Sequence, residues 1–511
     1  MDDNNKRIVK NTVYLYIRQI IIMALALVST RIVLDKLGVD DYGIYTVVGG
    51  FVAMFAILNN VLQSATRRFM AIALGKKDDL VIRKTFTTSL TMHVIIGLIV
   101  IVLLETIGVW LLNNKLNIDP TRLAAANWVF QISVFNVFIT ITQTPFIAAV
   151  TANEQFGIYA FMSIYDVVGK ILILFLLVYI PGDKLIIYAI LMSVVSFSGA
   201  MIYRLYCRKK FQECKTLALT VDKPLFKEML TFSGWDSLGN VMTVLNAQGT
   251  TVLLNMFLTT AVNAARGLAG TVTSTIANFV TGFVAASEPQ LAKYFAQGDM
   301  LRFERLICNI TQMTLFLLAI FAIPVFCEIE FVLKLWLGIV PEYTADFIKI
   351  TLVVCFLQYS YTMLIKGIVA IGRVKEYNTL SIVLALSNLP LVWLVLWLNW
   401  SPNAVYWVSS IPSLLNFTIT LYVLYRYEQF PVKEFITRVF LKNIFFILLS
   451  SVIPFYVRGQ MEDGWIRFFV VSGLSLLSTF SIMWLFVLNK ETKELITNKL
   501  KSLFRRKYAN P

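Results

Sequence analysis

Apolar stretches long enough to cross a bilayer recur along the whole chain. We count fourteen of them between short polar connections, and residues 85–112, 157–180 and 465–488 are examples. A bilayer core about 30 Å thick requires roughly 20 apolar helical residues. The connections leave no room for a separate soluble domain, which needs about 50 residues or more. The sequence therefore predicts an all-α polytopic membrane protein with about 14 transmembrane helices.

The basic residues gather in alternate connections, and this distribution explains the formal net charge of +15. Most of the 45 Lys and Arg lie near the two ends of the chain and in every second connection, including the segment from Arg204 to Lys227. By the positive-inside rule, both termini are cytoplasmic, and the charge predicts contacts with membrane lipids rather than with nucleic acid. The intervening connections hold only Lys36, Lys115, Arg122, Lys184, Lys334, Arg458 and Arg467.

Several classes of chemistry lack the residues they need. His93 is the only histidine, and the five cysteines show no paired spacing, so we expect no metal and no cofactor. No GxxxxGK[ST] loop is present for binding ATP. A membrane glycosyltransferase or polymerase would need catalytic groups in sizeable outer connections, and the longest here, residues 329–342, is short and mostly apolar. We therefore expect that the protein is not an enzyme.

Two pairs of segments repeat at nearly one offset. The segment from Ser64 resembles the one from Ala286 at an offset of 223, with Gly75 opposite Gly298, and IAAVTANEQF resembles IVAIGRVKEY at an offset of 221. An even number of spans separates the members of each pair, which predicts two six-helix lobes of the same orientation, suited to alternating access. The predicted division is an N-terminal lobe 1–206, a cytoplasmic linker 207–224, a C-terminal lobe 225–425, helices 13 and 14 over 426–488, and a basic cytoplasmic tail 489–511.

Ionisable residues inside the spans are the sharpest functional indicators, because each costs about 2.5–3.5 kcal/mol at the bilayer centre unless it faces a partner or water. Asp166 and Lys170, spaced i to i+4, can form an ion pair, either structural or facing the lumen. Asp236, in the run FSGWDSLGN, is a candidate protonatable or sodium-contacting carboxylate, or a group that satisfies a helix break. The ionisable residues within the spans are Arg18, Arg31, Glu105, Asp166, Lys170, Asp236, Arg266, Lys349 and Lys366. Bases outnumber acids among them, which favours an anionic cargo.

Depth separates these cations. Arg18 lies about 9 Å inside the cytoplasmic end of the first helix. Arg31 and Arg266 lie near the outer ends of their helices, where they could snorkel to the interface. Lys349 and Lys366 are expected at the interface. Amides spread through the helices indicate either interhelical hydrogen bonds or a sugar-lined lumen; they are Asn59, Asn60, Gln63, Gln131, Asn136, Gln143, Asn240, Asn246, Gln248 and Asn278.

The first helix and its outer turn, STRIVLDKLGVDDYGIYTVVGG, followed by the basic loop and the ANEQFG segment, resemble the polysaccharide flippases of the multidrug/oligosaccharidyl-lipid/polysaccharide exporter superfamily. The order of Arg, then LG, then YG-x-Y is the most specific part. The glycines suit tight backbone geometry, so we interpret these residues as a structural turn. The positions that match are Arg31, Leu37, Gly38, Tyr42, Gly43 and Tyr45.

The resemblance implies a MATE-like protein of the bacterial inner membrane that flips an undecaprenyl-pyrophosphate-linked O-antigen or capsule repeat unit to the periplasmic leaflet, with a polysaccharide polymerase as a candidate partner. From depth and charge we infer Arg18, Arg31, Lys170 and Arg266 as substrate-binding residues, and Asp236 or Asp166 as ion-coupling residues. A lipid II flippase and an ion-coupled multidrug exporter of the same superfamily are the alternatives.

Overall fold

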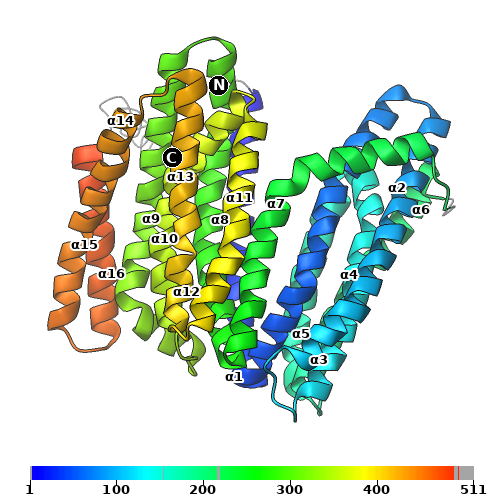
Figure 1. Cartoon of the computed structure of the whole chain (residues 1–511), viewed down its shortest axis with the longest axis horizontal. Helices are drawn as coiled ribbons and strands as arrows, with labels where there is room; N and C mark the ends of the chain where they lie inside the picture. Colours follow the sequence, from blue (N-terminus) through cyan, green and yellow to red (C-terminus); the bar gives the residue numbers. More distant parts are fainter. Residues whose placement is uncertain (1–2, 154, 216–218, 488–492, 494–511) are drawn as a thin grey trace, which may run out of the picture. The chain divides into compact units, whose positions relative to one another are not determined.

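The computed structural model describes residues 3–153, 155–215, 219–487 and 493. Regular secondary structure is helical throughout this part of the chain (Figure 1), which confirms the predicted all-α class. Nine stretches among the described residues are long and apolar enough to cross a membrane, so the chain is multi-pass, and the total of fourteen stays a prediction. The nine are Asp79–Asn114, Leu123–Ala152, Lys184–Lys210, Met300–Leu337, Thr344–Ala370, Val374–Trp397, Pro402–Glu428, Val432–Gln460 and Trp465–Val487.

The helices follow one another with short connections. The first half of the chain contains α1 (Asp3–Lys76), α2 (Asp79–Leu103), the π-helical segment η1 (Leu104–Gly108), α3 (Val109–Asn114), α4 (Leu123–Ala152), α5 (Phe156–Tyr179), α6 (Lys184–Lys210), the 3-10 turn η2 (Gln212–Cys214) and α7 (Lys223–Phe257). The second half contains α8 (Thr260–Ala296), α9 (Met300–Leu337), α10 (Thr344–Ala370), α11 (Val374–Trp397), α12 (Pro402–Val408), α13 (Ser410–Glu428), α14 (Val432–Glu434), η3 (Phe435–Leu441), α15 (Lys442–Gln460), α16 (Trp465–Ile482) and η4 (Met483–Val487).

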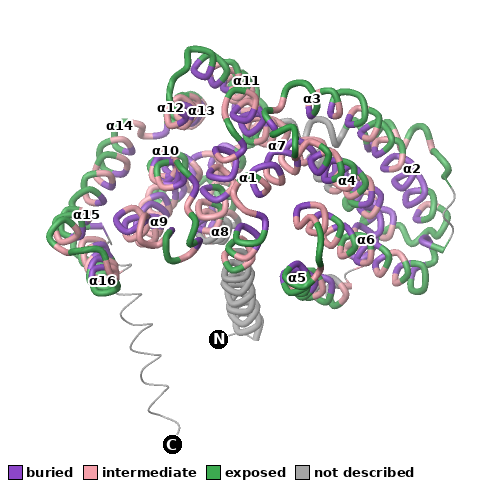
Figure 2. The backbone as a smooth tube through the Cα atoms, turned by 90° about the horizontal axis from the view of Figure 1, so that it is seen from below, coloured by how far each residue is buried: buried purple, intermediate pink, exposed green. Residues whose placement is uncertain are grey.

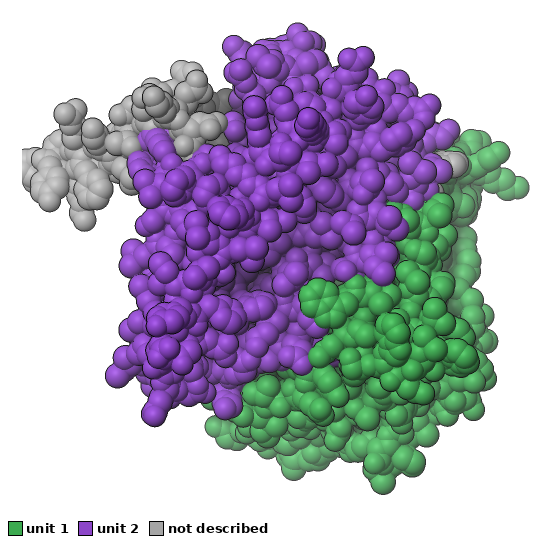
Figure 3. All heavy atoms as spheres, turned by 60° about the vertical axis from the view of Figure 1, so that its left-hand side comes forward, with its two compact units in different colours: residues 1–271, 337–344, 381–409 green, residues 272–336, 345–380, 410–511 purple. Residues whose placement is uncertain are grey.

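The chain divides into two compact units, which Figure 3 shows in different colours. Unit 1 comprises residues 1–271, 337–344 and 381–409, and unit 2 comprises residues 272–336, 345–380 and 410–511. The division into lobes at 206, 225 and 425 stays a prediction. The predicted linker 207–224 contains the last residues of α6, the turn η2 and the start of α7.

Unit 1 is built around α4, which packs against α1, α2 and α6. Its core contains Phe86 of α2, Phe146 of α4 and Cys207 of α6, together with residues of α1 and α5. Around the outer helices, buried and exposed residues share the circumference (Figure 2). The exposed positions of α2 include Leu98 and Val102. Such apolar exposure suits contact with lipid tails rather than with water.

Unit 2 has its own core, formed where α9, α10 and α13 meet η3. Phe303 and Leu364 are fully buried there, and Phe417 of α13 contacts Phe435 and Phe440 of η3 at ring-centroid distances of 6.4 and 4.9 Å. The aromatic contacts join the segment that precedes α15 to the rest of the unit. The C-terminal helices therefore continue from a packed region.

Two turns support the internal repeat. Between α1 and α2, Lys77 has φ 54° and Asp78 accepts a hydrogen bond from the backbone N–H of Leu80 at 2.9 Å. Between α8 and α9, Gly298 has φ 71° and Asp299 accepts one from Arg302 N at 3.1 Å. These turn positions place Lys77, rather than Gly75, opposite Gly298. The offset becomes 221, which equals the offset of the second matching pair.

The start of α7 is attached to a row of hydroxyl groups on α2. Thr220 Oγ1 donates to Thr87 Oγ1 at 3.0 Å, and the backbone N–H of Asp222 donates to Thr88 Oγ1 at 3.2 Å. Asp222 also caps α7 by accepting from Leu225 N at 3.1 Å. From this anchored end, α7 changes direction along its length (Figure 1), so its first part runs across the end of the neighbouring helices. The side chains over 232–240, which include Asp236, lie outside the described residues.

Candidate functional site

The glycine-rich turn after the first helix shapes the backbone of unit 1. Gly38 has φ 80° and ψ 173°, which interrupts α1, and only glycine adopts this conformation without strain. Gly43 lies so close to the start of α8 that a Cβ atom there would overlap the carbonyl oxygen of Thr260. Tyr42, which lies between these two glycines in the sequence, is buried. The arrangement fixes the second half of α1 against α8.

A charged cluster lies at the same end of unit 1. Arg122, before α4, donates to Asp41 at 2.6 and 2.7 Å and to Asp183, the cap of α6, at 2.6 and 3.0 Å. The hydrogen bonds from Arg122 lower the pKa of Asp183, whereas burial raises the pKa of Asp41. Sequence reasoning missed this cluster because Asp41, Arg122 and Asp183 are far apart in the sequence. Their opposite charges are the only sequence signal that connects them.

Arg266 of α8 is a cation held by neutral groups. Its Nε donates to Thr251 Oγ1 at 2.9 Å, and its Nη2 donates to the carbonyl oxygen of Ala247 at 2.8 Å. The guanidinium lies 5.6 Å from the ring centroid of Tyr406 in α12. No carboxylate forms an ion pair with it among the described residues. The hydroxyl, the carbonyl and the ring orient the guanidinium without neutralising its charge.

Amides near Arg266 have hydrogen-bonding capacity that the protein leaves unused. Asn263, one turn earlier on α8, is fully buried, and neither its Oδ1 nor its Nδ2 has a hydrogen-bond partner in the described protein. Asn246, which precedes Ala247 on α7, has a buried Oδ1 that accepts no hydrogen bond from the described residues. Buried amides usually find partners, so these atoms favour a polar ligand or water.

The other ionisable residues predicted in unit 1 have varied surroundings, and two of them lie outside the described side chains. Lys170 pairs with Asp166 at 2.7 Å on α5, and both side chains are about half exposed. Arg31 is exposed and has no ion-pair partner within the described ranges. The side chain of Arg18 lies outside the described residues, as does that of Asp236. Glu105, in the π-helical segment η1, accepts a hydrogen bond from Gln131 at 3.0 Å.

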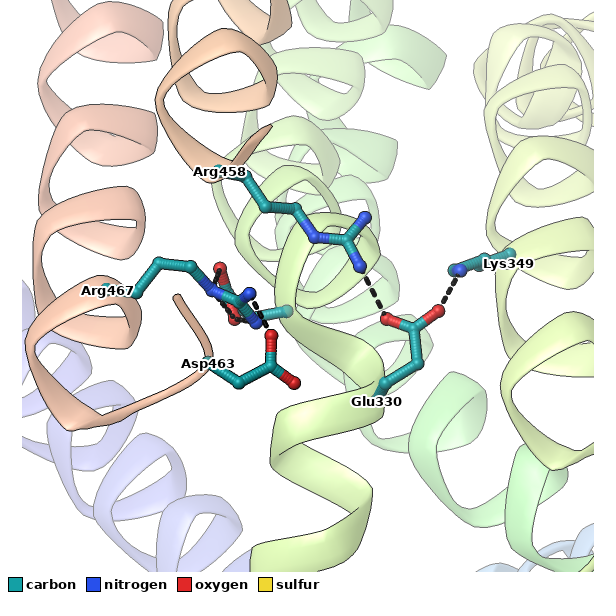
Figure 4. A network of polar contacts seen from close by, with 6 residues as sticks. Glu330, Lys349, Arg458, Asp463 and Arg467 are labelled. Carbon is teal, nitrogen blue, oxygen red and sulfur yellow. Dashed lines mark hydrogen bonds and ion pairs between the residues drawn. The ribbon is translucent and has the colours of Figure 1, made fainter. Parts of the chain in front are cut away.

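Unit 2 contains several ion pairs between its helices. Glu330 of α9 pairs with Lys349 of α10 and with Arg458 of α15, the latter at 2.9 Å (Figure 4). The expected outer connection 329–342 is wrong at its start, because α9 continues to Leu337 and carries Glu330 on a helix. Glu330 therefore links three helices, α9, α10 and α15. At another point in the unit, Lys366 pairs with Glu288 at 2.8 Å.

A second ion pair lies beside the first and is more deeply buried. Arg467 of α16 donates to Glu328 at 2.8 to 3.3 Å and also pairs with Asp463 (Figure 4). The side chains of Glu328 and Arg467 are 0% and 6% exposed. Glu328 stands at a kink of α9, four residues after Pro324. Sequence analysis assigned Arg458 and Arg467 to an outer connection, whereas both lie on helices and bind α9.

The fold is similar to that of solved membrane transporters. Lipid II flippase MurJ, in an inward closed conformation, has a TM-score of 0.71 and 14% sequence identity, over 95% of this chain and 100% of that one. An inward-facing multidrug resistance MATE family transporter of the MOP superfamily has a TM-score of 0.66 and 12% identity, over 81% and 96%. At such low sequence identities, the structural similarity shows the fold alone.

A third solved structure also has a similar fold. It is a MOP superfamily transporter from Pyrococcus furiosus, with a TM-score of 0.52 and 12% identity over 81% of this chain and 96% of that one, and its binding pocket is described as having reverse polarity. No curated protein matches the sequence. The family model described as polysaccharide biosynthesis protein matches residues 8–295, which is more than half of the chain.

Proposed function

The chain belongs to the polysaccharide biosynthesis protein family, and from this premise we propose that it flips an undecaprenyl-pyrophosphate-linked oligosaccharide repeat unit between the leaflets of a bacterial inner membrane. Membership confirms the family predicted from the first helix and its glycine turn. The cargo, its direction from the cytoplasmic to the periplasmic leaflet, and the cytoplasmic location of both termini are parts of the proposal.

Arg266 is the observation that carries this proposal. A sugar headgroup with a pyrophosphate cannot cross hydrocarbon unaided, because its hydroxyls and anionic oxygens would lose water without replacement. Arg266 offers an intramembrane positive charge that Thr251, Ala247 and Tyr406 orient without neutralising. Hydrogen bonds between arginine and phosphate are among the stronger ones in proteins. The free amide atoms of Asn246 and Asn263 suit sugar hydroxyls.

Other residues complete the proposed path. Arg18, Arg31 and Lys170 would add positive charge for the pyrophosphate, although Lys170 is already engaged by Asp166. For the same reason we prefer Asp236 to Asp166 as the carboxylate that couples the cycle to an ion gradient. The two six-helix lobes would alternate access by rocking, while the lipid tail stays in the bilayer.

The lipid II flippase remains the nearest alternative, since it shares the lipid carrier and the charge of the cargo. Its structure aligns with 95% of this chain, against 81% for the drug transporters, which supports a flippase over a drug exporter at the level of architecture. A drug exporter for cationic compounds would be expected to present acidic groups, and Arg266 presents the opposite charge.

Deletion of the gene in its native host tests the proposed function. We expect undecaprenyl-linked repeat units to accumulate on the cytoplasmic side while surface polysaccharide is lost, and the intact gene to restore both. Rescue of cells depleted of their lipid II flippase would instead identify lipid II as the cargo. Normal surface polysaccharide with altered drug sensitivity would contradict the proposal.

A further inference from the structure

A second cation held by neutral groups lies on α6 of unit 1. Arg204 Nη2 donates to Thr142 Oγ1 at 2.8 Å, and its guanidinium lies 5.8 Å from the ring centroid of Phe146, both on α4. Its Nε is buried and has no hydrogen-bond partner among the residues that the structure describes. No carboxylate pairs with Arg204 in the part of the chain that the structure describes. The sequence assigned it to a cytoplasmic connection, whereas it stands inside a helix that continues to Lys210.

The position of Arg204 along α6 sets its depth. The helix begins at Lys184, directly after Asp183, which Arg122 binds at the outer end of the unit. Twenty residues separate Lys184 from Arg204, and at 1.5 Å per residue they span about 30 Å, the thickness of a bilayer core. Arg204 therefore lies at the opposite membrane boundary, one turn before exposed basic residues such as Arg208.

Arg204 and Arg266 lie near opposite ends of unit 1. The helix α8 begins at Thr260, whose hydroxyl donates to Asp40 at 3.0 Å beside the cluster of Asp41, Arg122 and Asp183. Arg266 is six residues into this helix, about 9 Å from that end. Each arginine donates to a threonine hydroxyl and lies near an aromatic ring. Neither forms an ion pair with a carboxylate among the described residues.

Holding a half-buried arginine without neutralising it is costly unless a ligand supplies the counter-charge. Thr142 and Phe146 can only accept from, or stack on, the guanidinium, and neither supplies a negative charge. The ligand that fits is an oxyanion with several acceptor oxygens at the level of the inner headgroups. Both a pyrophosphate and the phosphate of an ordinary anionic lipid have this chemistry.

We propose that Arg204 is the first binding residue for the pyrophosphate of the cargo at the inner membrane surface, and that Arg266 binds it later, nearer the outer surface. This inference rests on the proposed function and deepens it. It assigns two stations to one anionic group within unit 1, each made of an arginine whose charge the protein orients and does not cancel.

Binding to the full-length protein in phosphatidylethanolamine nanodiscs tests the inner station. The probes are undecaprenyl pyrophosphate and, separately, phosphatidylglycerol. We expect Arg204→Gln to weaken binding of the pyrophosphate by about tenfold or more, the loss of charge-assisted hydrogen bonds. Arg208→Gln, one turn further on the same helix and exposed, is the matched control and should change binding less than about twofold. Arg204→Lys should retain part of the affinity, because it keeps the charge without the planar fork.

The outcomes separate the inference from the proposed function. Unchanged pyrophosphate binding by Arg204→Gln would overturn the inner station and leave the flippase proposal intact. An equal loss for phosphatidylglycerol, or an equal loss in Arg208→Gln, would show a general headgroup site and also overturn it. A wild-type protein that binds no pyrophosphate would contradict the proposed function itself. If Arg204→Gln fails to fold, Thr142→Val removes only the orienting hydroxyl, and unchanged affinity there would overturn the station.

Discussion

Two cations of unit 1 and the ion-paired cations of unit 2 have contrasting surroundings. In unit 2, Glu328, Glu330 and Glu288 neutralise the basic residues that face them, and the pairs join α8, α9, α10, α15 and α16. In unit 1, Arg266 and Arg204 are oriented by hydroxyls, a carbonyl and aromatic rings. A neutralised charge holds helices together, whereas an oriented but unneutralised one can still form an ion pair with a ligand. We propose that this difference separates structural from functional cations better than depth alone.

The largest effect is expected at the buried ion pair of unit 2. Arg467→Met leaves Glu328, which is fully buried, without its partner, and breaking a buried pair costs about 3–5 kcal/mol. The unfolding temperature of the purified protein should fall accordingly. The double variant Glu328→Gln with Arg467→Met should recover much of the lost stability. Export per folded molecule should stay close to wild type. A stable Arg467→Met protein that no longer exports would reverse the assignment of roles.

The next effect concerns transport rather than stability. Arg266→Gln removes charge-assisted hydrogen bonds worth about 1.5–3 kcal/mol, so surface polysaccharide export in the deletion strain should drop roughly tenfold to a hundredfold. Membrane abundance and thermal unfolding of the variant serve as controls and should change little. Full export with Arg266→Gln would place the anion elsewhere.

The glycine turn gives a smaller effect on stability. Gly43→Ala introduces a methyl group against the backbone of Thr260, and overpacking of this kind costs about 1–3 kcal/mol. Gly49→Ala, on the same helix with open space around it, is the matched control and should be neutral or slightly stabilising. Equal unfolding temperatures for the two variants would contradict the close approach of α1 and α8.

The smallest effect is expected at the exposed pair of unit 1. Because Lys170 and Asp166 are both about half exposed, their ion pair contributes about 1 kcal/mol or less. Lys170→Met should lower export only slightly, and Asp166→Asn with Lys170→Met should restore it. A double variant as inactive as Arg266→Gln would show that a neutralised pair can act directly in transport, and the comparison between the units would then fail.

The sequence predicted the class of the fold and the family, and its limits have physical causes. Long apolar runs indicate spanning helices by composition alone. Gly43 in YG-x-Y indicates a close approach of two backbone segments, but the sequence does not identify Thr260 as the residue it approaches. Ion pairs such as Arg467 with Glu328 join residues 139 positions apart, and no local pattern encodes that contact. Arg204 escaped notice because positive charge at a helix end is expected from topology, and only its contacts with Thr142 and Phe146 distinguish it from Arg208.

The most direct test of the central claim is the transfer of an undecaprenyl-pyrophosphate-linked oligosaccharide across proteoliposomes that contain the purified protein. Accessibility of the sugar to an external lectin or glycosidase measures the transfer. We expect wild-type protein to move the lipid, Arg266→Gln to move it at least about tenfold more slowly, and Glu328→Gln with Arg467→Met to move it at a rate near wild type. Equal rates for Arg266→Gln and wild type would contradict the assignment of function to the unneutralised cations of unit 1.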